Sequence, residues 1–407
     1  MKFSHLEFKE VKGVGSIEVD FTPDKKVYAF IGENGVGKTK FLEALFQLFI
    51  LSSQKFKKFY KPNDNLRPIV IKNENGNVLS QALRQAINSV SSCDDDIFSE
   101  VVVGKSTILL STIRDNFIDK KGFSDFESEN ELKFYEATVF ISAKNRGFIK
   151  NALKEKGYEI GSFSKRRSRY VNQIVDGITN ENDFSNQQME TNIEQWFISI
   201  AQSSNPFQKK QDNREIEIRT VLKLFNEIDA SIDPNFMEIG EDNHVFLKVN
   251  DQKIQLSHLS TGYASILKII QSIVSGYGYF TNEQQLQHVR GIVLIDEIES
   301  HLHLSWQSKI IPTLKELFPN TTFYITTHSP VVLIQLEEGE AYRLQREDDG
   351  VVRSSIIHHP SNISFIDLQK RAFDLDLNKI KREKMSVDSQ KEANQALLDL
   401  INEEAVD

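Results

Sequence analysis

The 407-residue chain is poor in cysteine, glycine and proline. Its single cysteine, Cys93, excludes a disulfide within the chain and any zinc site built on paired Cys-x-x-Cys ligands. With 19 glycines and 9 prolines, these two residue types have about half of their average share. This scarcity predicts long regular elements and argues against collagen-like or low-complexity sequence.

The chain also lacks long apolar runs and an excess of positive charge. No stretch of about 18 consecutive apolar residues occurs, and the first residues contain no apolar segment of the kind that directs secretion. We therefore expect a cytoplasmic protein that makes no membrane contact. The net charge of -9 opposes attraction of the whole surface to nucleic acid, which leaves local basic patches as candidate contacts.

Apolar patterning predicts an α/β fold. Alternation of strand and helix beyond residue 237 favours a mostly parallel sheet covered by helices. We expect one large domain over 1–360, with insertions at about 52–130 and 150–235, the second of them helical, followed by a helical tail over 361–407. Strands are expected at 2–8, 16–21, 27–31, 137–142, 245–249, 292–296 and 322–326, and helices at 40–51, 189–202, 216–228, from 261, at 305–318 and from 388.

One loop fits G-x-x-x-x-G-K-[ST], directly after the strand expected at 27–31 and before the helix at 40–51. Its glycines let consecutive backbone N–H groups surround phosphates, and the helix N-terminus adds positive partial charge. Lys38 would reach the β- and γ-phosphates, and the Thr39 hydroxyl would ligate Mg²⁺. The sequence therefore predicts a site for ATP and Mg²⁺. Its nucleotide-binding residues are Gly32, Glu33, Asn34, Gly35, Val36, Gly37, Lys38 and Thr39.

Two adjacent carboxylates, Asp296 and Glu297, follow four apolar residues of a predicted strand. Because successive side chains of a strand point to opposite faces, the two can have different roles. Asp296 is expected to hold the metal together with Thr39, and Glu297 to orient and deprotonate the attacking water. The competing interpretation is a buried strand that ends in a solvated acidic turn.

His328 and the pair Ser260 and Gly262 complete the candidate site. His328 follows the strand at 322–326, where a parallel neighbour of the acidic strand would end beside the phosphates, so we expect a γ-phosphate contact. Ser260 and Gly262 begin a helix whose N-terminus could hold a second phosphate, and capping of that helix would by itself explain the serine. Since the first loop already holds a phosphate in one subunit, the second site is expected to act across a dimer.

Four segments in this order resemble the ABC-type ATPases: GENGVGKT, LSTGY in place of LSGGQ, IVLIDE and THSP. The resemblance covers about residues 1–50 and 240–335. It implies an ABC-type P-loop ATPase head that forms a homodimer, or a higher assembly of such dimers, with ATP between Lys38 and Thr39 of one subunit and Ser260 and Gly262 of the other. The glutamine that the family carries between its first helix and the strand at 137–142 has no evident counterpart.

The segment that begins at Asp296 has the pattern DE-x-E-x-HLH. This pattern is similar to that of one branch of these ATPases. That branch contains the overcoming-lysogenisation-defect ATPases and the ATPase subunits of Septu-type and retron-associated defence systems, and the chain looks most like the Septu subunit. In this branch Lys38, Glu297 and His328 would be the catalytic residues. The segment after His328 is too short for the nuclease domain of the overcoming-lysogenisation-defect enzymes, so the resemblance implies a separately encoded nuclease, with the HNH type as candidate.

Three functions follow from this resemblance. The first is an ATP-hydrolysing subunit that dimerises around ATP and regulates an effector nuclease in antiphage defence. The second is a stand-alone DNA-binding ATPase of repair or recombination. The third is a scaffold in which ATP is structural and slowly hydrolysed. Turnover, nucleic-acid binding and nucleotide retention would separate them.

A basic stretch lies between residues 144 and 170, with nine basic and two acidic side chains interleaved with aromatic ones. Contact with a phosphate backbone, aided by aromatic stacking, is one interpretation. A solvated insertion surface, or docking on an acidic partner, is the other. The candidate nucleic-acid contacts are Lys144, Arg146, Lys165, Arg166, Arg167 and Arg169.

Overall fold

The computed structural model divides into two compact units, Met1–Ser361 and Asn362–Asp407. It describes residues 5–11, 13–52, 70–72, 97–103, 106–112, 137–144, 146–147, 149, 165–167, 170, 173–174, 192–205, 207, 212–373 and 379. In the second unit the described helix is α12 (Phe365–Phe373), in which Leu368 and Ala372 are buried. The helix predicted from residue 388 lies outside the described residues, as do the parts of both predicted insertions that fall between these ranges.

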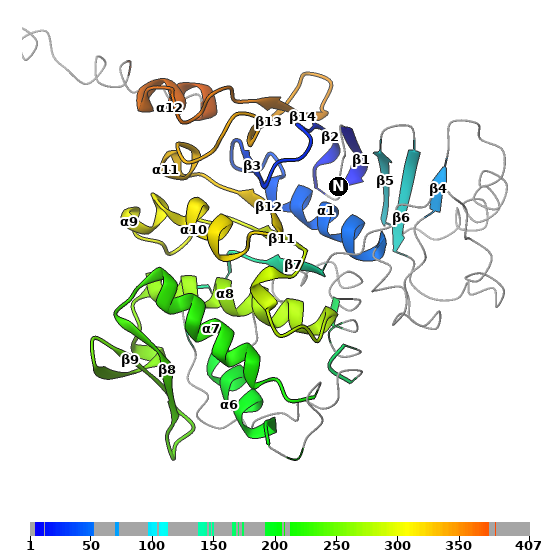
Figure 1. Cartoon of the computed structure of the whole chain (residues 1–407). Helices are drawn as coiled ribbons and strands as arrows, with labels where there is room; N and C mark the ends of the chain where they lie inside the picture. The colour runs from blue at the N-terminus through cyan, green and yellow to red at the C-terminus, as the bar shows by residue number, and fades with distance from the viewer. Residues whose placement is uncertain are drawn as a thin grey trace, which may run out of the picture. The chain divides into compact units, whose positions relative to one another are not determined.

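An eleven-stranded mixed sheet forms the centre of the first unit (Figure 1). Its strand order is β4-β6-β5-β1-β2-β14-β13-β3-β12-β11-β7. The strands are β1 (His5–Val11), β2 (Gly15–Asp20), β3 (Val27–Ile31), β4 (Val70–Lys72), β5 (Ile97–Val103), β6 (Ser106–Thr112), β7 (Ala137–Ile141), β11 (Gly291–Ile295), β12 (Thr321–Thr326), β13 (Ala341–Arg346) and β14 (Val352–Ile356).

Four strands of this sheet, in the order β3-β12-β11-β7, run parallel. Every residue of β3, β7 and β11 is buried. Parallel strands with both faces covered are typically continuous apolar runs, and that is how these segments look in the sequence. Their carboxyl ends meet at one edge of the sheet, which is where ligands bind in open α/β sheets. The predicted α/β class with a mixed, mostly parallel sheet is confirmed.

Helix α1 (Lys38–Ser52) packs on this sheet and buries most of its side chains between residues 38 and 50. The ring of Phe41 lies edge-on to Phe8 of β1 and to Phe30 of β3, with centroid separations of 5.7 and 4.8 Å. Phe46 makes a similar contact with Phe140 of β7, at 5.6 Å. These aromatic pairs fix the start of α1 against the end of β3, so the loop between them is held at both ends.

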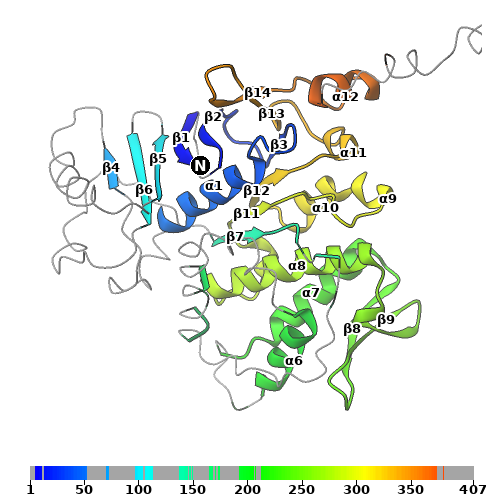
Figure 2. The ribbon, with the colours of Figure 1, turned by 180° about the vertical axis from the view of Figure 1, so that it is seen from behind.

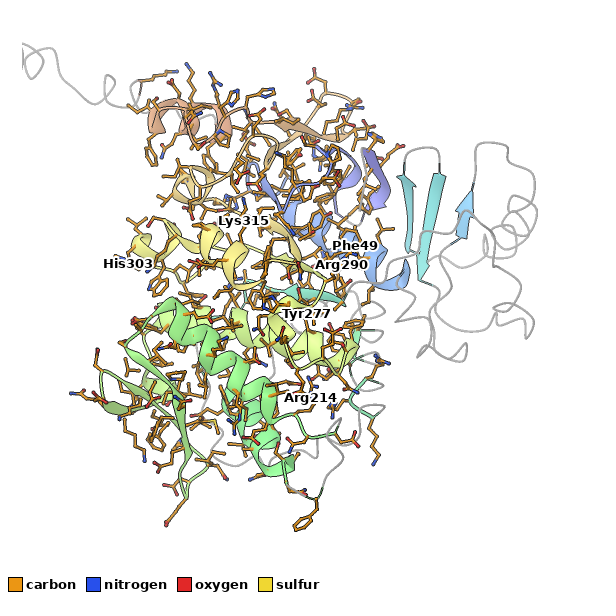
Figure 3. All side chains as sticks on the ribbon, in the orientation of Figure 1. Phe49, Arg214, Tyr277, Arg290, His303 and Lys315 are labelled. Atoms are coloured by element: carbon orange, nitrogen blue, oxygen red, sulfur yellow. The ribbon has the colours of Figure 1, made fainter. Side chains whose placement is uncertain are left out.

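Helices α6 (Ile193–Ser203), α7 (Glu215–Ile228) and α8 (Thr261–Phe280) lie together on the β7 side of the sheet (Figures 1 and 2). Tyr277 of α8 is fully buried, and its hydroxyl shares a hydrogen bond of 2.6 Å with Thr321 of β12. At the start of α7, Arg214 donates to Glu217 over 2.6 Å (Figure 3). A second sheet, β8 (Ile232–Ile239), β9 (Val245–Val249) and β10 (Gln252–Gln255), connects α7 to α8 through antiparallel hairpins.

The structure corrects one predicted element. The expected helix at 305–318 is two helices, α9 (Leu304–Gln307) and α10 (Ile310–Leu317). Pro312 explains the break, because proline has no N–H to donate and its ring clashes with the carbonyl four residues earlier, so it is tolerated only in the first turn of a helix. Helix α10 therefore begins anew just before Pro312.

Among the residues with described placement, no helix combines the length and the apolar character needed to cross a bilayer.

Candidate nucleotide site

The phosphate-binding loop lies between β3 and α1, as predicted. Gly32 has φ +155°, and a Cβ there would lie 2.4 Å from the carbonyl oxygen of Leu344. Gly37 has φ +108°, and a Cβ there would lie 2.7 Å from the Val14 side chain. Both positions thus require glycine for conformation and for space. Glu33, Asn34 and Gly35 are exposed and Val36 is buried, so the middle of the loop faces outward.

Lys38 is held inside this loop. Its side chain is 7% exposed, and Nζ donates hydrogen bonds of 2.9 Å to the carbonyl oxygens of Gly32 and Glu33. Burial lowers the pKa of Lys38, an effect that the nearby carboxylates of Asp296 and Glu297 oppose. The amino group is therefore a poorly solvated cation with neutral partners, which is a state that an incoming anion would stabilise.

Asp296 joins the loop to the sheet. Its carboxylate accepts hydrogen bonds from the Thr39 hydroxyl, at 2.9 and 3.1 Å, and from the Thr326 hydroxyl, at 2.6 Å. Burial raises the pKa of Asp296, and the hydrogen bonds from Thr326 and Thr39 counteract that rise. The structure therefore brings Thr39 and Asp296, the two predicted metal ligands, into direct contact at the carboxyl edge of the sheet.

Glu297 follows in a left-handed conformation with φ +44°. Such a conformation costs a residue other than glycine about 1–3 kcal/mol and persists only where the surroundings enforce it. Its backbone N–H donates to the Thr326 hydroxyl over 2.7 Å, and its side-chain carboxylate accepts from the Ser300 hydroxyl over 2.8 Å. Glu297 thus leaves the strand in a sharp turn that separates its carboxylate from that of Asp296.

Arg146 holds the other side of this turn. Its guanidinium donates to the backbone carbonyl of Asp296 over 2.9 Å and to that of Glu297. The side chain is 0% exposed, and burial lowers its pKa to about 10. The sequence offered Arg146 as a candidate nucleic-acid contact, with a solvated or partner-docking surface as the alternative, and the structure shows both to be wrong for Arg146 because its side chain has no solvent-accessible surface.

His328 is anchored through its own backbone. Glu299, two residues beyond Glu297, accepts from the His328 N–H over 2.6 Å and from the Thr327 hydroxyl over 2.7 Å. Burial lowers the pKa of His328, and the positive charge of Lys38 lowers it further. Both effects disfavour the charged imidazolium form of His328.

Ser260 and Gly262 form the first turn of α8. Ser260 is exposed and caps the helix by accepting from the N–H of Tyr263 at 3.4 Å, so the capping interpretation is confirmed. A Cβ on Gly262 would lie 3.8 Å from its nearest neighbours, which is ordinary van der Waals contact. The packing of this subunit therefore does not require glycine at position 262.

Tyr263 stands where the family signature has glutamine, and it connects this turn to α7. Its hydroxyl donates to the carboxylate of Asp229, at the C-terminal end of α7. That bond, aided by burial, raises the pKa of Tyr263 to about 12. Burial would raise the pKa of Asp229, but hydrogen bonds from Tyr263 and Ser231 lower it overall.

We expect Tyr263→Phe to lower the free energy of unfolding by about 1–2 kcal/mol at pH 7, the value of a hydrogen bond to a charged group on a partly exposed residue. The lowered pKa of Asp229 means that this stabilisation is present at neutral pH and is lost as the pH falls through that pKa. Urea unfolding of both proteins across an acidic pH series measures the effect. A difference that stays constant to the lowest pH would contradict this assignment.

The residues at the sheet edge fit a magnesium nucleotide. Magnesium is usually held by one or two carboxylates together with substrate phosphates, and Asp296 with the Thr39 hydroxyl supplies such an oxygen pair. Within the described ranges no group of three or more His, Cys, Asp or Glu side chains could hold a metal without further ligands. The donor set therefore suits a metal that arrives with phosphate oxygens.

Three of the five basic side chains described in this stretch, Arg146, Arg166 and Arg167, are built into the fold. Arg166 is 4% exposed and Arg167 donates to the carbonyls of Tyr279 and Phe280, at 2.9 and 2.8 Å, which closes the C-terminal end of α8. Burial makes a nucleic-acid contact wrong for Arg166 as well, whereas Arg167 is half-buried and its candidate contact stays a prediction. Lys144 and Lys165 are exposed, and Arg169 lies outside the described residues.

Sequence reasoning missed Thr326 and Glu299. Thr326 ends a buried strand, and its hydroxyl bonds both to Asp296 and to the N–H of Glu297. Glu299 lies in the DE-x-E-x-HLH segment that begins at Asp296, and its carboxylate accepts hydrogen bonds from Thr327 and His328. In the sequence each is a polar residue two positions from a predicted site residue, Thr326 before His328 and Glu299 after Glu297, and such a pattern is too common to be specific.

Fold and site together are those of an ABC-type ATPase head: a phosphate-binding loop, an acidic strand end and a histidine at the next strand end, on neighbouring parallel strands. The chain belongs to the family described as "AAA domain, putative AbiEii toxin, Type IV TA system", which matches residues 27–334.

Named relatives place it more closely. The chain is similar to the Septu protein PtuA of Bacillus thuringiensis, at 22% identity, over 85% of this chain and 76% of the relative. It is similar to the retron Vc95 probable ATPase of Vibrio cholerae serotype O1 biovar El Tor, at 25% identity, over 82% of this chain and 69% of the relative. A solved SMC head bound to the C-winged helix domain of ScpA aligns with a TM-score of 0.41 at 14% identity, covering 88% of this chain and 98% of that one. The protein is an ABC-type ATPase of the Septu and retron branch.

Proposed function

We propose that the chain binds and hydrolyses ATP at the carboxyl edge of β3, β11 and β12. The observation that carries this proposal is the convergence of five predicted site residues there. Lys38 lies in the phosphate-binding loop, Thr39 contacts Asp296, Glu297 follows it, and the backbone of His328 is tied to the same segment through Glu299.

Each residue has a proposed role in that reaction. Lys38 exchanges its two carbonyl partners for the β- and γ-phosphates, and Thr39 and Asp296 hold Mg²⁺, which would neutralise charge on the phosphate oxygens. Glu297 orients a water and accepts its proton. The imidazole of His328, whose backbone is anchored by Glu299, donates a hydrogen bond to the γ-phosphate and so stabilises the charge that develops there.

A homodimer completes the site in this proposal. Ser260 is exposed at a helix N-terminus, and Gly262 is a glycine that its own subunit does not need. Backbone without side chain at a helix N-terminus allows close approach of a phosphate from the other subunit. ATP would then lie between Lys38 and Thr39 of one copy and Ser260 and Gly262 of the other.

Gly262→Ala should weaken ATP-dependent assembly without impairing folding. Alanine fits the subunit without contacts closer than 3.8 Å and is favoured over glycine in helices by up to about 1 kcal/mol, so the melting temperature should stay the same or rise. ATP-dependent dimerisation should weaken by at least about tenfold, since a methyl group would occupy the space of the phosphate. Light scattering with and without ATP, together with thermal melts, measures both. A Gly262→Ala protein that dimerises with ATP like wild type would contradict the shared site.

We further propose that the dimer regulates a separately encoded nuclease, with an HNH enzyme as candidate, in antiphage defence in the cytoplasm. The likeness to PtuA and to a retron ATPase supports this context. Co-purification from the native operon, with and without ATP, would identify the partner. Two results would favour the alternatives instead: tight duplex binding with a steep salt dependence would favour a DNA repair ATPase, and retained nucleotide without turnover would favour a scaffold.

A further inference from the structure

Arg146 is the largest fully buried side chain among those described, and it is a charged one. It follows β7 and lies outside the phosphate-binding loop, the acidic strand and the histidine segment. Two of its nitrogens, Nη1 and Nη2, donate to the consecutive carbonyls of Asp296 and Glu297. Burial of a guanidinium raises the free energy of the folded state unless its hydrogen bonds compensate. A fully buried arginine at this place therefore suggests a specific role.

The target of these hydrogen bonds is the residue with the unusual backbone. Glu297 has φ +44°, its N–H is bound by the Thr326 hydroxyl, and its carbonyl is bound by Arg146. The same carbonyl also accepts from the Ser300 N–H over 2.8 Å, so both backbone polar groups of Glu297 are held, the carbonyl by two donors. Because the direction of a side chain follows from the backbone that carries it, these contacts set where the Glu297 carboxylate points.

We propose that Arg146 is a positioning residue for hydrolysis: it holds the left-handed turn at Glu297 and thereby aims the carboxylate at the attacking water. The inference rests on the role proposed above for Glu297. It differs from a contribution to ATP binding, since the contacts of Arg146 go to the acidic turn and none of its bonds goes to the phosphate-binding loop in the described residues. Arginine suits the task because its rigid fork spans two consecutive carbonyls, which a lysine ammonium does not match.

The test compares Arg146→Lys with Arg167→Lys. Arg167 is a matched control, since it also donates from two nitrogens to two consecutive carbonyls, those of Tyr279 and Phe280 at the end of α8. For Arg146→Lys we expect the turnover number to fall on the order of 100-fold, the effect of a misplacement of about 1 Å, while affinity for a fluorescent ATP analogue changes less than about threefold. Arg167→Lys should lower the melting temperature without a fall in turnover number that exceeds the change in ATP affinity.

An increase in ATP-loaded dimers would distinguish a positioning role of Arg146 from damage to the fold. If Arg146 acts through Glu297, Arg146→Lys should accumulate ATP-loaded dimers in light scattering, as is expected of Glu297→Gln, because both variants should bind ATP and fail to hydrolyse it. Should Arg146→Lys not fold, Arg146→Gln, which keeps an N–H donor without a charge to bury, takes its place in the same measurements. Normal turnover in a folded Arg146 variant, or parallel loss of turnover and ATP affinity, would overturn the inference. If Glu297→Gln itself hydrolyses ATP normally, the proposed function fails, whatever Arg146 does.

Discussion

Lys38→Ala is expected to abolish ATP binding at micromolar nucleotide. Lys38 is the buried cation at the phosphate-binding loop, and in the absence of phosphate its two hydrogen bonds go to Gly32 and Glu33 carbonyls. Two charge-assisted hydrogen bonds to phosphate contribute about 3–4 kcal/mol, which corresponds to a loss of affinity of about 10² to 10³. Turnover and ATP-dependent dimerisation should disappear with binding. Titration with a fluorescent ATP analogue measures the affinity directly.

Lys40→Ala is the matched control for this change. Lys40 lies two residues further along α1, with its side chain 41% exposed and its amino group paired with Glu43 at 2.6 Å. Its removal should leave ATP affinity unchanged. Equal affinity in the two variants would remove Lys38 from the site.

The fold could be predicted where a single segment contains its own signal. The runs that became β3 and β11 are apolar throughout and the run that became β7 departs from this only at Thr138, and buried parallel strands need such runs. The phosphate-binding loop has its glycines, its lysine and both flanking elements within one short stretch. Pro312 was also visible in the sequence, and applying the rule that proline belongs in the first turn would have split the helix at 305–318 correctly.

Burial of charge could not be predicted from the same sequence. A count of basic residues between 144 and 170 treats every arginine alike, whereas Arg146 and Arg166 are buried and Arg167 binds carbonyls. The partners of Arg146 lie 150 and 151 residues away along the chain. They are backbone carbonyls, which every residue has, so no side-chain pattern indicates them. Hydrogen bonds of this kind depend on the assembled sheet and not on local sequence.

Thr326 illustrates the same limit inside the site. Its place at the end of an apolar strand was visible, but its importance comes from the parallel pairing of β11 with β12, which brings its hydroxyl beside Asp296 and Glu297. The sequence therefore indicates which strands end at the site. Only the register of those strands shows which neighbouring residues hold the catalytic groups in place.

Glu297→Gln is expected to stop hydrolysis while preserving ATP binding. Glutamine has nearly the same shape, so its amide oxygen can still accept from Ser300, and the backbone contacts with Thr326 and Arg146 remain. It cannot accept a proton from water. Loss of a general base lowers the rate by about 10² to 10⁴, so steady-state phosphate release should fall by that factor. With hydrolysis blocked, ATP-loaded dimers should persist, and light scattering at saturating ATP measures them.

Glu316→Gln makes the same chemical change on the exposed face of α10 and should leave both readouts unchanged. Comparison of the two variants separates the loss of a general base from the loss of a carboxylate charge elsewhere on the protein. If Glu297→Gln lost ATP binding together with turnover, the carboxylate would be acting on the nucleotide or the metal, and Asp296 would have to share its role. If turnover persisted, another group would have to accept the proton. Glu299 is a poor substitute, because both of its carboxylate oxygens already accept hydrogen bonds from Thr327 and His328. A retained rate would therefore point to solvent or to phosphate itself as the proton acceptor.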